Sequence, residues 1–177
     1  MGPVNPVRWN MHAFPGLSKR RRCRRAYLLY LVAFSVSCSV TTTAPGRSVV
    51  LSPAQTQMLL SPCSRNAPQG VEATWIVPQE VVDQLEANLY KLARLRADQC
   101  CILRGRIRYP GTYFRQYVGI VIGNRRLVYI NAFRSASDKA EWRSEAVVAC
   151  DGGDDYWGAV YDPETKVFSN LAINGLA

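Results

Sequence analysis

Apolar side chains recur at helical spacing over residues 78 to 96. The apolar positions, three or four residues apart, are Val82, Leu85, Leu89 and Leu92. Side chains at this spacing share one face of an amphipathic helix. Pro78 suits the first helical turn, and acidic residues near the start with basic residues near the end complement the helix dipole. The pattern predicts one helix over Pro78–Arg96, with its apolar stripe in the core.

After this helix the hydrophobic period changes to two, which is typical of strands with one buried face. Turn-forming residues separate the alternating stretches at Pro110-Gly111, at Gly123-Asn124 and at Asp162–Thr165. The predicted strands are residues 103–109, 113–122, 127–133, 145–150, 156–161 and 167–173. We therefore expect an α+β fold, with one N-terminal amphipathic helix packed on a four- to six-stranded antiparallel sheet.

The first forty residues have a different pattern, in which a basic cluster runs into an apolar stretch. Residues 19–25 carry six positive charges and no negative one, and residues 26–34 are apolar or aromatic. This order, followed by small residues, is typical of a secretory signal peptide. The apolar run is shorter than the roughly 17 residues that a membrane span needs, so we expect its removal after export. Residues 1–38 are assigned to the signal peptide, with Met11 as an alternative start.

Residues 34–38, Phe-Ser-Val-Ser-Cys, resemble the lipobox of bacterial lipoproteins. Val36 and Ser37 fit the two positions before the cysteine, whereas Ser35 stands where that family usually has Leu, Val or Ile. The resemblance implies a lipid on Cys38, which would tether the protein to a membrane as a periplasmic or outer-membrane-anchored protein. The alternative is ordinary cleavage between Ser39 and Ala44, followed by free secretion.

The remaining chain is long enough for one core. Removal of residues 1–38 from the 177 leaves 139, which suits one domain rather than two. Residues 39–72, rich in Thr, Ser and Pro, are predicted to form a tether, and residues 73–177 a single α+β domain. The part from Tyr113 onward resembles small uncharacterised bacterial envelope proteins, which supports an envelope location and implies no site residues.

The positive charge of the chain is concentrated in the predicted signal. The sequence has 22 Lys and Arg against 13 Asp and Glu, a net charge of +9. Residues 1–38 hold seven of the basic residues and none of the acidic ones, so the remainder has 15 against 13, or +2. A nucleic-acid-binding domain needs its excess positive charge on the folded part, so no nucleic-acid partner is expected.

Four cysteines follow the predicted signal: Cys63, Cys100, Cys101 and Cys150. An even number of cysteines in an exported chain favours disulfides. Since adjacent cysteines are poorly placed to bond each other, we expect Cys63 to pair with one of Cys100 and Cys101, and Cys150 with the other. Buried free thiols are the alternative. The spacing lacks the Cys-x₂-Cys element of zinc sites, and no metal or other cofactor is expected.

The only histidine, His12, lies within the predicted signal peptide. The mature chain therefore lacks the histidine of the Ser-His-Asp and Cys-His nucleophile pairs. Its densest acidic cluster is Asp151, Asp154 and Asp155, separated by two glycines. Such a cluster suits a solvated turn, and it offers too few oxygens for Ca²⁺. A histidine-independent hydrolase using these aspartates is the alternative function.

Basic and aromatic side chains alternate along two predicted strands. Arg104, Arg106 and Arg108 share one side of the first strand, and Tyr113, Arg115 and Tyr117 share one side of the next. Arg and Tyr are enriched where proteins bind partners, so this face is our candidate site for an anionic ligand or an envelope protein. The other interpretation is the ordinary polar side of a sheet that faces water. The sequence thus favours a non-enzymatic exported envelope binding or inhibitor module, and it leaves the oligomeric state open.

Overall fold

The computed structural model describes residues 2, 46–97, 105–137 and 141–176. The chain divides into two units, Met1–Thr41 and Thr42–Ala177, and all the described elements belong to the second. Cys38, Cys100, Cys101 and Arg104 lie outside the described residues. The lipidation site and part of the predicted binding face therefore stay predictions.

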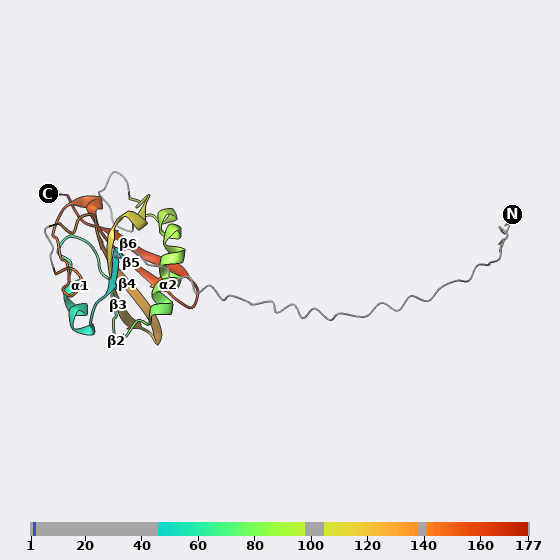
Figure 1. Ribbon diagram of the computed structural model, residues 1–177, viewed down its shortest axis with the longest axis horizontal. Helices are drawn as coiled ribbons and strands as arrows, with labels where there is room; N and C mark the ends of the chain where they lie inside the picture. Colours follow the sequence, from blue (N-terminus) through green and yellow to red (C-terminus); the bar gives the residue numbers. More distant parts are fainter. Residues whose placement is uncertain (1, 3–45, 98–104, 138–140, 177) are drawn as a thin grey trace, which may run out of the picture. The chain divides into compact units, whose positions relative to one another are not determined.

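One six-stranded sheet forms the centre of the folded unit (Figure 1). Its strands are β1 (Ser48–Val50), β2 (Ala73–Trp75), β3 (Phe114–Ile122), β4 (Arg125–Phe133), β5 (Tyr156–Asp162) and β6 (Val167–Ile173). The strand order is β1-β3-β4-β5-β6, and β2 pairs with β3 beside β1. All pairs are antiparallel except β1 with β3, which is parallel.

Helical segments cover both faces of this sheet. They are η1 (Pro53–Gln55), α1 (Thr56–Leu59), α2 (Gln79–Asn88), η2 (Leu89–Arg94), η3 (Pro110–Thr112) and η4 (Gly153–Asp155), where η denotes a 3₁₀-helix. α2 and its continuation η2 occupy the range 78–96 in which the sequence predicts a helix. Figure 1 shows α2 on one side of the strands and α1 on the other. The fold is thus of mixed α and β character, as expected.

A tight turn sets the register of the β3–β4 hairpin. Gly123 and Asn124 both have positive φ, at 52° and 66°, as the two central residues of a type I′ turn require. Nine residue pairs follow from this turn, from Ile122 opposite Arg125 to Phe114 opposite Phe133. The hairpin predicted from Gly123-Asn124 is therefore confirmed.

The face of the sheet under α2 holds the larger apolar core. Leu85, Leu89 and Leu92 of the helix are almost fully buried. They belong to one cluster with sheet residues that include Tyr117, Ile130 and Trp157. Burial of each such side chain stabilises the fold by about 1.5–3 kcal/mol before the entropic cost of ordering it. The predicted apolar stripe is the surface by which the helix joins the sheet.

This packing corrects one part of the predicted binding face. The side of β3 that carries Arg115 and Tyr117, with Tyr113 just before the strand, is expected to face water, yet Tyr113, Arg115 and Tyr117 are only 3%, 5% and 0% exposed. α2 lies on this side, because Tyr113 and Tyr117 share the core cluster with its leucines. The opposite side of β3, with Val118 and Ile120, is buried as well. Both faces of the strand are therefore covered.

The strands predicted at 103–109 and 145–150 are wrong where the structure describes them. Residues 105–109 and 145–150 are irregular and pair with no strand. Alternation persists in the first segment, since Ile107 is buried between exposed Arg106 and Arg108. A single apolar anchor produces the same two-residue pattern as a strand, which explains the error.

Residues 46–72 are part of the folded unit, which corrects the predicted tether. Within them, β1 adds a strand to the sheet, and Leu51 and Leu59 are 5% and 1% exposed. These leucines pack with Val118 and Ile120 on the face opposite α2. The apolar positions here are too few and too scattered to show a period, so the sequence pattern resembled a linker.

Side-chain amides hold the irregular segment 142–151 against the sheet. Gln116 donates to the carbonyls of Trp142 and Glu145, each at 2.6 Å, and accepts from the Val147 amide at 2.9 Å. Asn131 donates to Gln116 Oε1 at 2.8 Å. Buried backbone groups must form hydrogen bonds. In this segment the side-chain amides supply the bonds that a paired neighbouring strand would otherwise make.

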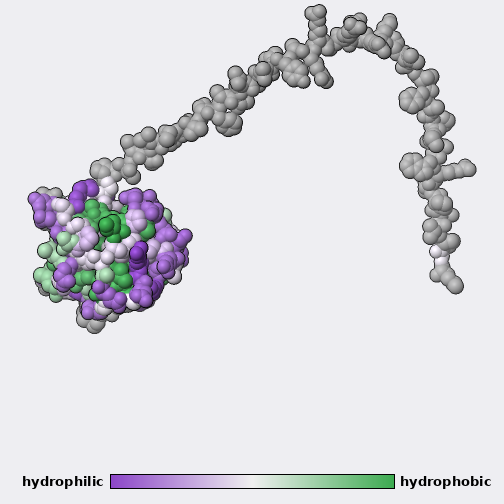
Figure 2. Space-filling model, turned by 90° about the horizontal axis from the view of Figure 1, so that it is seen from below, coloured by the Kyte–Doolittle hydropathy of each residue, from purple (hydrophilic) through white to green (hydrophobic). Residues whose placement is uncertain are grey.

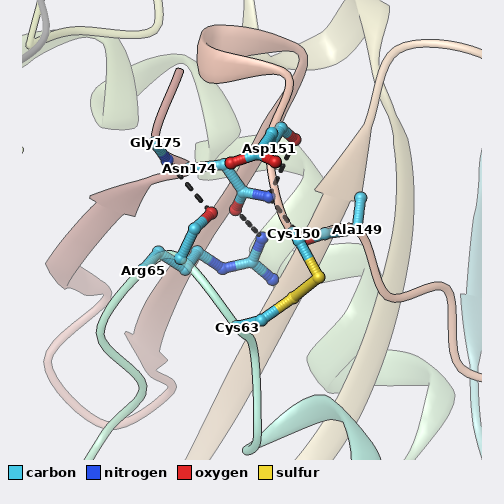
Figure 3. Close-up of a disulfide and its surroundings, with 8 residues drawn as sticks. Cys63, Arg65, Ala149, Cys150, Asp151, Asn174 and Gly175 are labelled. Atoms are coloured by element: carbon cyan, nitrogen blue, oxygen red, sulfur yellow. Dashed lines mark hydrogen bonds between the residues drawn. A yellow bond between two sulfur atoms is a disulfide. The ribbon is translucent and has the colours of Figure 1, made fainter. Parts of the chain in front are cut away.

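A disulfide joins the two irregular segments on this side (Figure 3). Cys63 bonds to Cys150, 87 residues away, which corrects the predicted pairing of each with Cys100 or Cys101. Next to it, buried Arg65 donates to Asn174 Oδ1 at 2.6 Å, as Figure 3 shows, and to Asn131 Oδ1 at 2.5 Å. The disulfide supports the expectation of an exported protein.

The surface of the folded unit is mixed in polarity. On the face shown in Figure 2, apolar side chains gather in patches that hydrophilic ones border. No helix among the described residues has both the length and the apolar character required to cross a bilayer.

We predict that the double variant Cys63→Ser/Cys150→Ser loses about 3–4 kcal/mol of unfolding free energy in urea denaturation, because the closed loop is long. Both cysteines are exposed, so serine leaves the packing intact. Non-reducing peptide mapping of the wild type checks the pairing directly. A peptide joining Cys63 to Cys100 or Cys101 would contradict the structure.

Candidate functional site

Two adjoining clefts lie beside the loop that leads into β3. The first has a volume of about 480 Å³. Its lining residues are Ala93, Arg106, Ile107, Arg108, Tyr109, Thr112, Tyr113, Arg134 and Asp154. Three guanidinium groups and one carboxylate thus meet in one concave space. Arg106, Arg108 and Tyr113 were candidates from the sequence, and Asp154 belonged to the alternative hydrolase site.

Arg106 and Arg108 reach this cleft from the irregular segment before Pro110. Ile107, between them, is 1% exposed and packs in the core under α2. The Gly105 carbonyl accepts a hydrogen bond from the Ala97 amide at 2.6 Å, which ties the segment to the end of η2. The two arginines therefore stand outward from an anchored backbone.

Arg134, which follows the last residue of β4, enters the same cleft from the sheet. Its Nε donates to Asp155 Oδ1 at 2.5 Å, and its Nη2 donates to the Tyr113 hydroxyl at 2.7 Å. Its guanidinium also lies 4.6 Å from the centre of the Tyr113 ring. The hydrogen bond to Asp155 raises the pKa of Arg134. This arginine is held as a cation in one orientation.

Tyr113 forms part of the wall between the cleft and the core. Its hydroxyl donates to the Asp154 carbonyl at 2.9 Å, and its ring packs edge-on against Trp157. Burial raises the pKa of Tyr113, although the charge of Arg134 opposes the shift. The phenol therefore stays protonated at neutral pH, where it donates a hydrogen bond and does not act as a base.

Arg115 of β3 connects α2 to residues 110–113, the cleft loop. Its Nη2 donates to both carboxylate oxygens of Glu86, each at 3.1 Å, and Tyr117 donates to Glu86 Oε1 at 2.6 Å. Its Nη1 donates to the carbonyls of Tyr113, of Gly111 at 3.3 Å and of Pro110 at 3.4 Å. The predicted binding role of Arg115 and Tyr117 gives way to a positioning role, since both are buried.

Burial raises the pKa of Tyr117 well above its usual range, and the neighbouring Glu86 carboxylate adds to the shift. The hydroxyl is thus a permanent donor to Glu86. This bond and the pair with the buried Arg115 together satisfy the carboxylate of Glu86, which is itself partly exposed.

The second cleft lies on the other side of Arg108 and Tyr109. It measures about 470 Å³, and Glu86 and Arg115 contribute to its lining. Tyr90 and Tyr109, which are 61% and 72% exposed, also line it. They are the two aromatic side chains that stay largely exposed among the residues that the structure describes.

The aspartate cluster does not form a carboxylate site. Asp154 and Asp155 form the 3₁₀ turn η4, whose preceding Gly152 has a φ of 99°. Asp155 is paired with Arg134, and Asp151 is exposed and accepts a hydrogen bond from Asn174 through its carbonyl. Asp154 is the one carboxylate that lines the first cleft. The aspartates lie in a turn, as predicted, but the turn joins no hairpin because residues 145–150 form no strand.

Sequence patterns missed four residues of these clefts: Glu86, Tyr90, Tyr109 and Arg134. Glu86 and Tyr90 belong to the predicted helix, but nothing in the helix pattern distinguishes their surroundings. Arg134 is separated from Arg106 by 28 positions, and only the β3–β4 hairpin brings it beside Tyr113. Tyr109 lies in the alternating stretch before Pro110. Its position close to Arg106 and Arg108 is the sequence signal that could have marked it as a binding residue.

Among the described residues, no group of three or more His, Cys, Asp or Glu side chains is placed to hold a metal ion. Comparisons of the chain with protein-family models, curated proteins and solved structures found no match.

Proposed function

We propose that the protein is a non-enzymatic, exported binding module whose first cleft takes an anionic group. The observation that carries this proposal is the convergence of Arg106, Arg108 and Arg134 on one cleft. Guanidinium groups pair with carboxylate and phosphate oxygens through two parallel hydrogen bonds. Asp155 already neutralises Arg134 and Asp154 also lines the cleft, so Arg106 and Arg108 together leave it with a net positive charge.

The site is better suited to binding than to catalysis. Tyr113 is held as a donor, and Arg134 is held as a cation. A carboxylate-based hydrolase needs two acidic groups facing the substrate, whereas the first cleft has the single Asp154. The side chains instead form a fixed basic surface, which favours recognition of an anionic ligand or of an acidic group on an envelope protein.

The proposed location is the bacterial envelope. The disulfide between Cys63 and Cys150 supports an oxidising compartment. The signal-like pattern of residues 19–39 and the lipobox-like sequence before Cys38 support export and a membrane tether. We propose periplasmic or outer-membrane-anchored placement through a lipid on Cys38, with free secretion as the alternative.

The anion site is tested with citrate as the probe, by isothermal titration calorimetry at low salt. The variant Arg106→Ala/Arg108→Ala is expected to lower citrate affinity about fivefold to thirtyfold, since two exposed ion pairs together contribute about 1–2 kcal/mol. Both side chains are exposed, so the melting temperature should not change. Arg126→Ala, at the other end of β4 from Arg134, is the matched control.

Citrate affinity that is equal in the wild type and the double variant would refute the anion site. An equal loss in Arg126→Ala would also refute it, because the attraction would then come from overall charge and not from the cleft.

Mass spectrometry of the exported protein tests the tether. We expect the mature chain to begin at Cys38 and to carry a diacylglyceryl group. An unmodified N-terminus between Ser39 and Ala44 would establish free secretion instead.

A further inference from the structure

The second cleft extends the proposed anion site rather than forming a separate one. Both clefts are lined by Arg108, Tyr109 and Thr112, so their walls are shared. A ligand held in the first cleft continues into the second by passing over the Arg108–Tyr109 pair. Each cleft has the size of a small-molecule site, about 300–1,000 Å³. Together they accommodate a chain of several units.

The character of the walls changes from one cleft to the other. Three arginines from two segments line the first cleft, whereas the second adds Tyr90 to the Tyr109 that both clefts share. Large exposed aromatic rings are costly in water, and these two are the exposed aromatic side chains of the described residues. Their position in one cleft beside a cationic one points to a ligand with flat apolar faces and negative charges.

The loop backbone between the clefts is already hydrogen-bonded. The Thr112 amide donates to the Tyr109 carbonyl at 3.1 Å, and the Tyr113 amide donates to the Pro110 carbonyl at 3.3 Å. The carbonyls of Pro110 and Gly111 accept from Arg115, and that of Thr112 accepts from Arg47. A peptide that binds by strand addition needs free backbone groups, so this loop is a poor peptide acceptor.

We infer that the two clefts bind an acidic oligosaccharide, a conclusion that rests on the proposed anion-binding function. The flat carbon–hydrogen face of a sugar ring packs on an aromatic ring, and Tyr109 and Tyr90 present such rings. The carboxylates of uronic-acid units pair with Arg106 and Arg108. The ion pair of Arg115 with Glu86 at the floor of the second cleft adds no net charge there. A sugar ring in the second cleft therefore meets two exposed tyrosines together with a charge-balanced ion pair.

The test uses four defined probes with the full mature chain: hexagalacturonate, monomeric galacturonate, uncharged maltohexaose and hexaglutamate. Binding is measured by isothermal titration calorimetry. Hexagalacturonate is expected to bind at least about tenfold more tightly than each of the other three, because it alone carries several sugar rings together with several carboxylates and can fill both clefts.

Tyr109→Ala is expected to lower hexagalacturonate affinity about tenfold, by analogy with the loss of an aromatic stacking platform. Tyr109→Phe keeps the ring and serves as the matched control, with affinity near the wild type. Tyr90→Ala, at a residue that lines only the second cleft, is expected to lower hexagalacturonate affinity as well but to leave citrate affinity unchanged, which separates the oligosaccharide inference from the anion site itself.

Three results would overturn the inference while the arginine-dependent binding of citrate stands. The first is equal affinity for hexaglutamate, which would assign the clefts to an acidic peptide. The second is equal affinity for monomeric galacturonate, which would confine binding to the first cleft. The third is full hexagalacturonate affinity in Tyr109→Ala. Equal affinity for maltohexaose would contradict the need for charge and would count against the anion site as well.

Discussion

The guanidinium of Arg115 joins the three parts of the molecule that build the clefts. Arg115 is a residue of β3. Its guanidinium pairs with Glu86 of α2 and donates to the carbonyls of Pro110, Gly111 and Tyr113 in the cleft loop. A buried cation is costly unless every donor finds an acceptor. The loop conformation supplies those acceptors, so the position of the loop and the burial of Arg115 depend on each other.

On the opposite face of the sheet, side-chain amides surround a second buried arginine, Arg65. There the segment 142–151 covers the strands without pairing as a strand itself. Gln116, Asn131 and Asn174 bind its backbone, and the Cys63–Cys150 disulfide closes the layer. Buried polar networks of this kind favour one arrangement of the segments around them. The rigid sheet between the two layers then holds Arg134 and Tyr113 in the first cleft.

The elements set by local chemistry were predictable from the sequence. Gly123-Asn124 specifies its turn because only a few residue types tolerate positive φ at both positions, and the strands beside it follow from alternation. The helix range follows from the leucine spacing. The covering of both sheet faces was not predictable, because Tyr113, Arg115 and Tyr117 alternate as water-facing residues do. The buried polar groups of Arg115 and Tyr117 are satisfied by Glu86, about thirty positions earlier, and no local pattern records that pairing.

The candidate site was predictable in part for the same reason. Arg106 and Arg108 were recognisable as a basic pair, whereas Arg134 and Tyr90 join them only through tertiary contacts. The disulfide is the clearest case in which the sequence alone leads to a wrong prediction. Sequence arithmetic favoured bonds to Cys100 and Cys101, but the folding of residues 46–72 onto the sheet brings Cys63 to Cys150.

The central claim is that the Glu86–Arg115 pair holds the cleft loop in place. Amide hydrogen exchange at Thr112 and Tyr113 tests it most directly in Glu86→Ala, with the exposed Glu80→Ala on the same helix as control. Relative to the core amide of Ile130, exchange at the two loop amides should become about tenfold faster in Glu86→Ala and stay unchanged in Glu80→Ala. Loop amides that exchange no faster than in the wild type, relative to Ile130, would contradict the account.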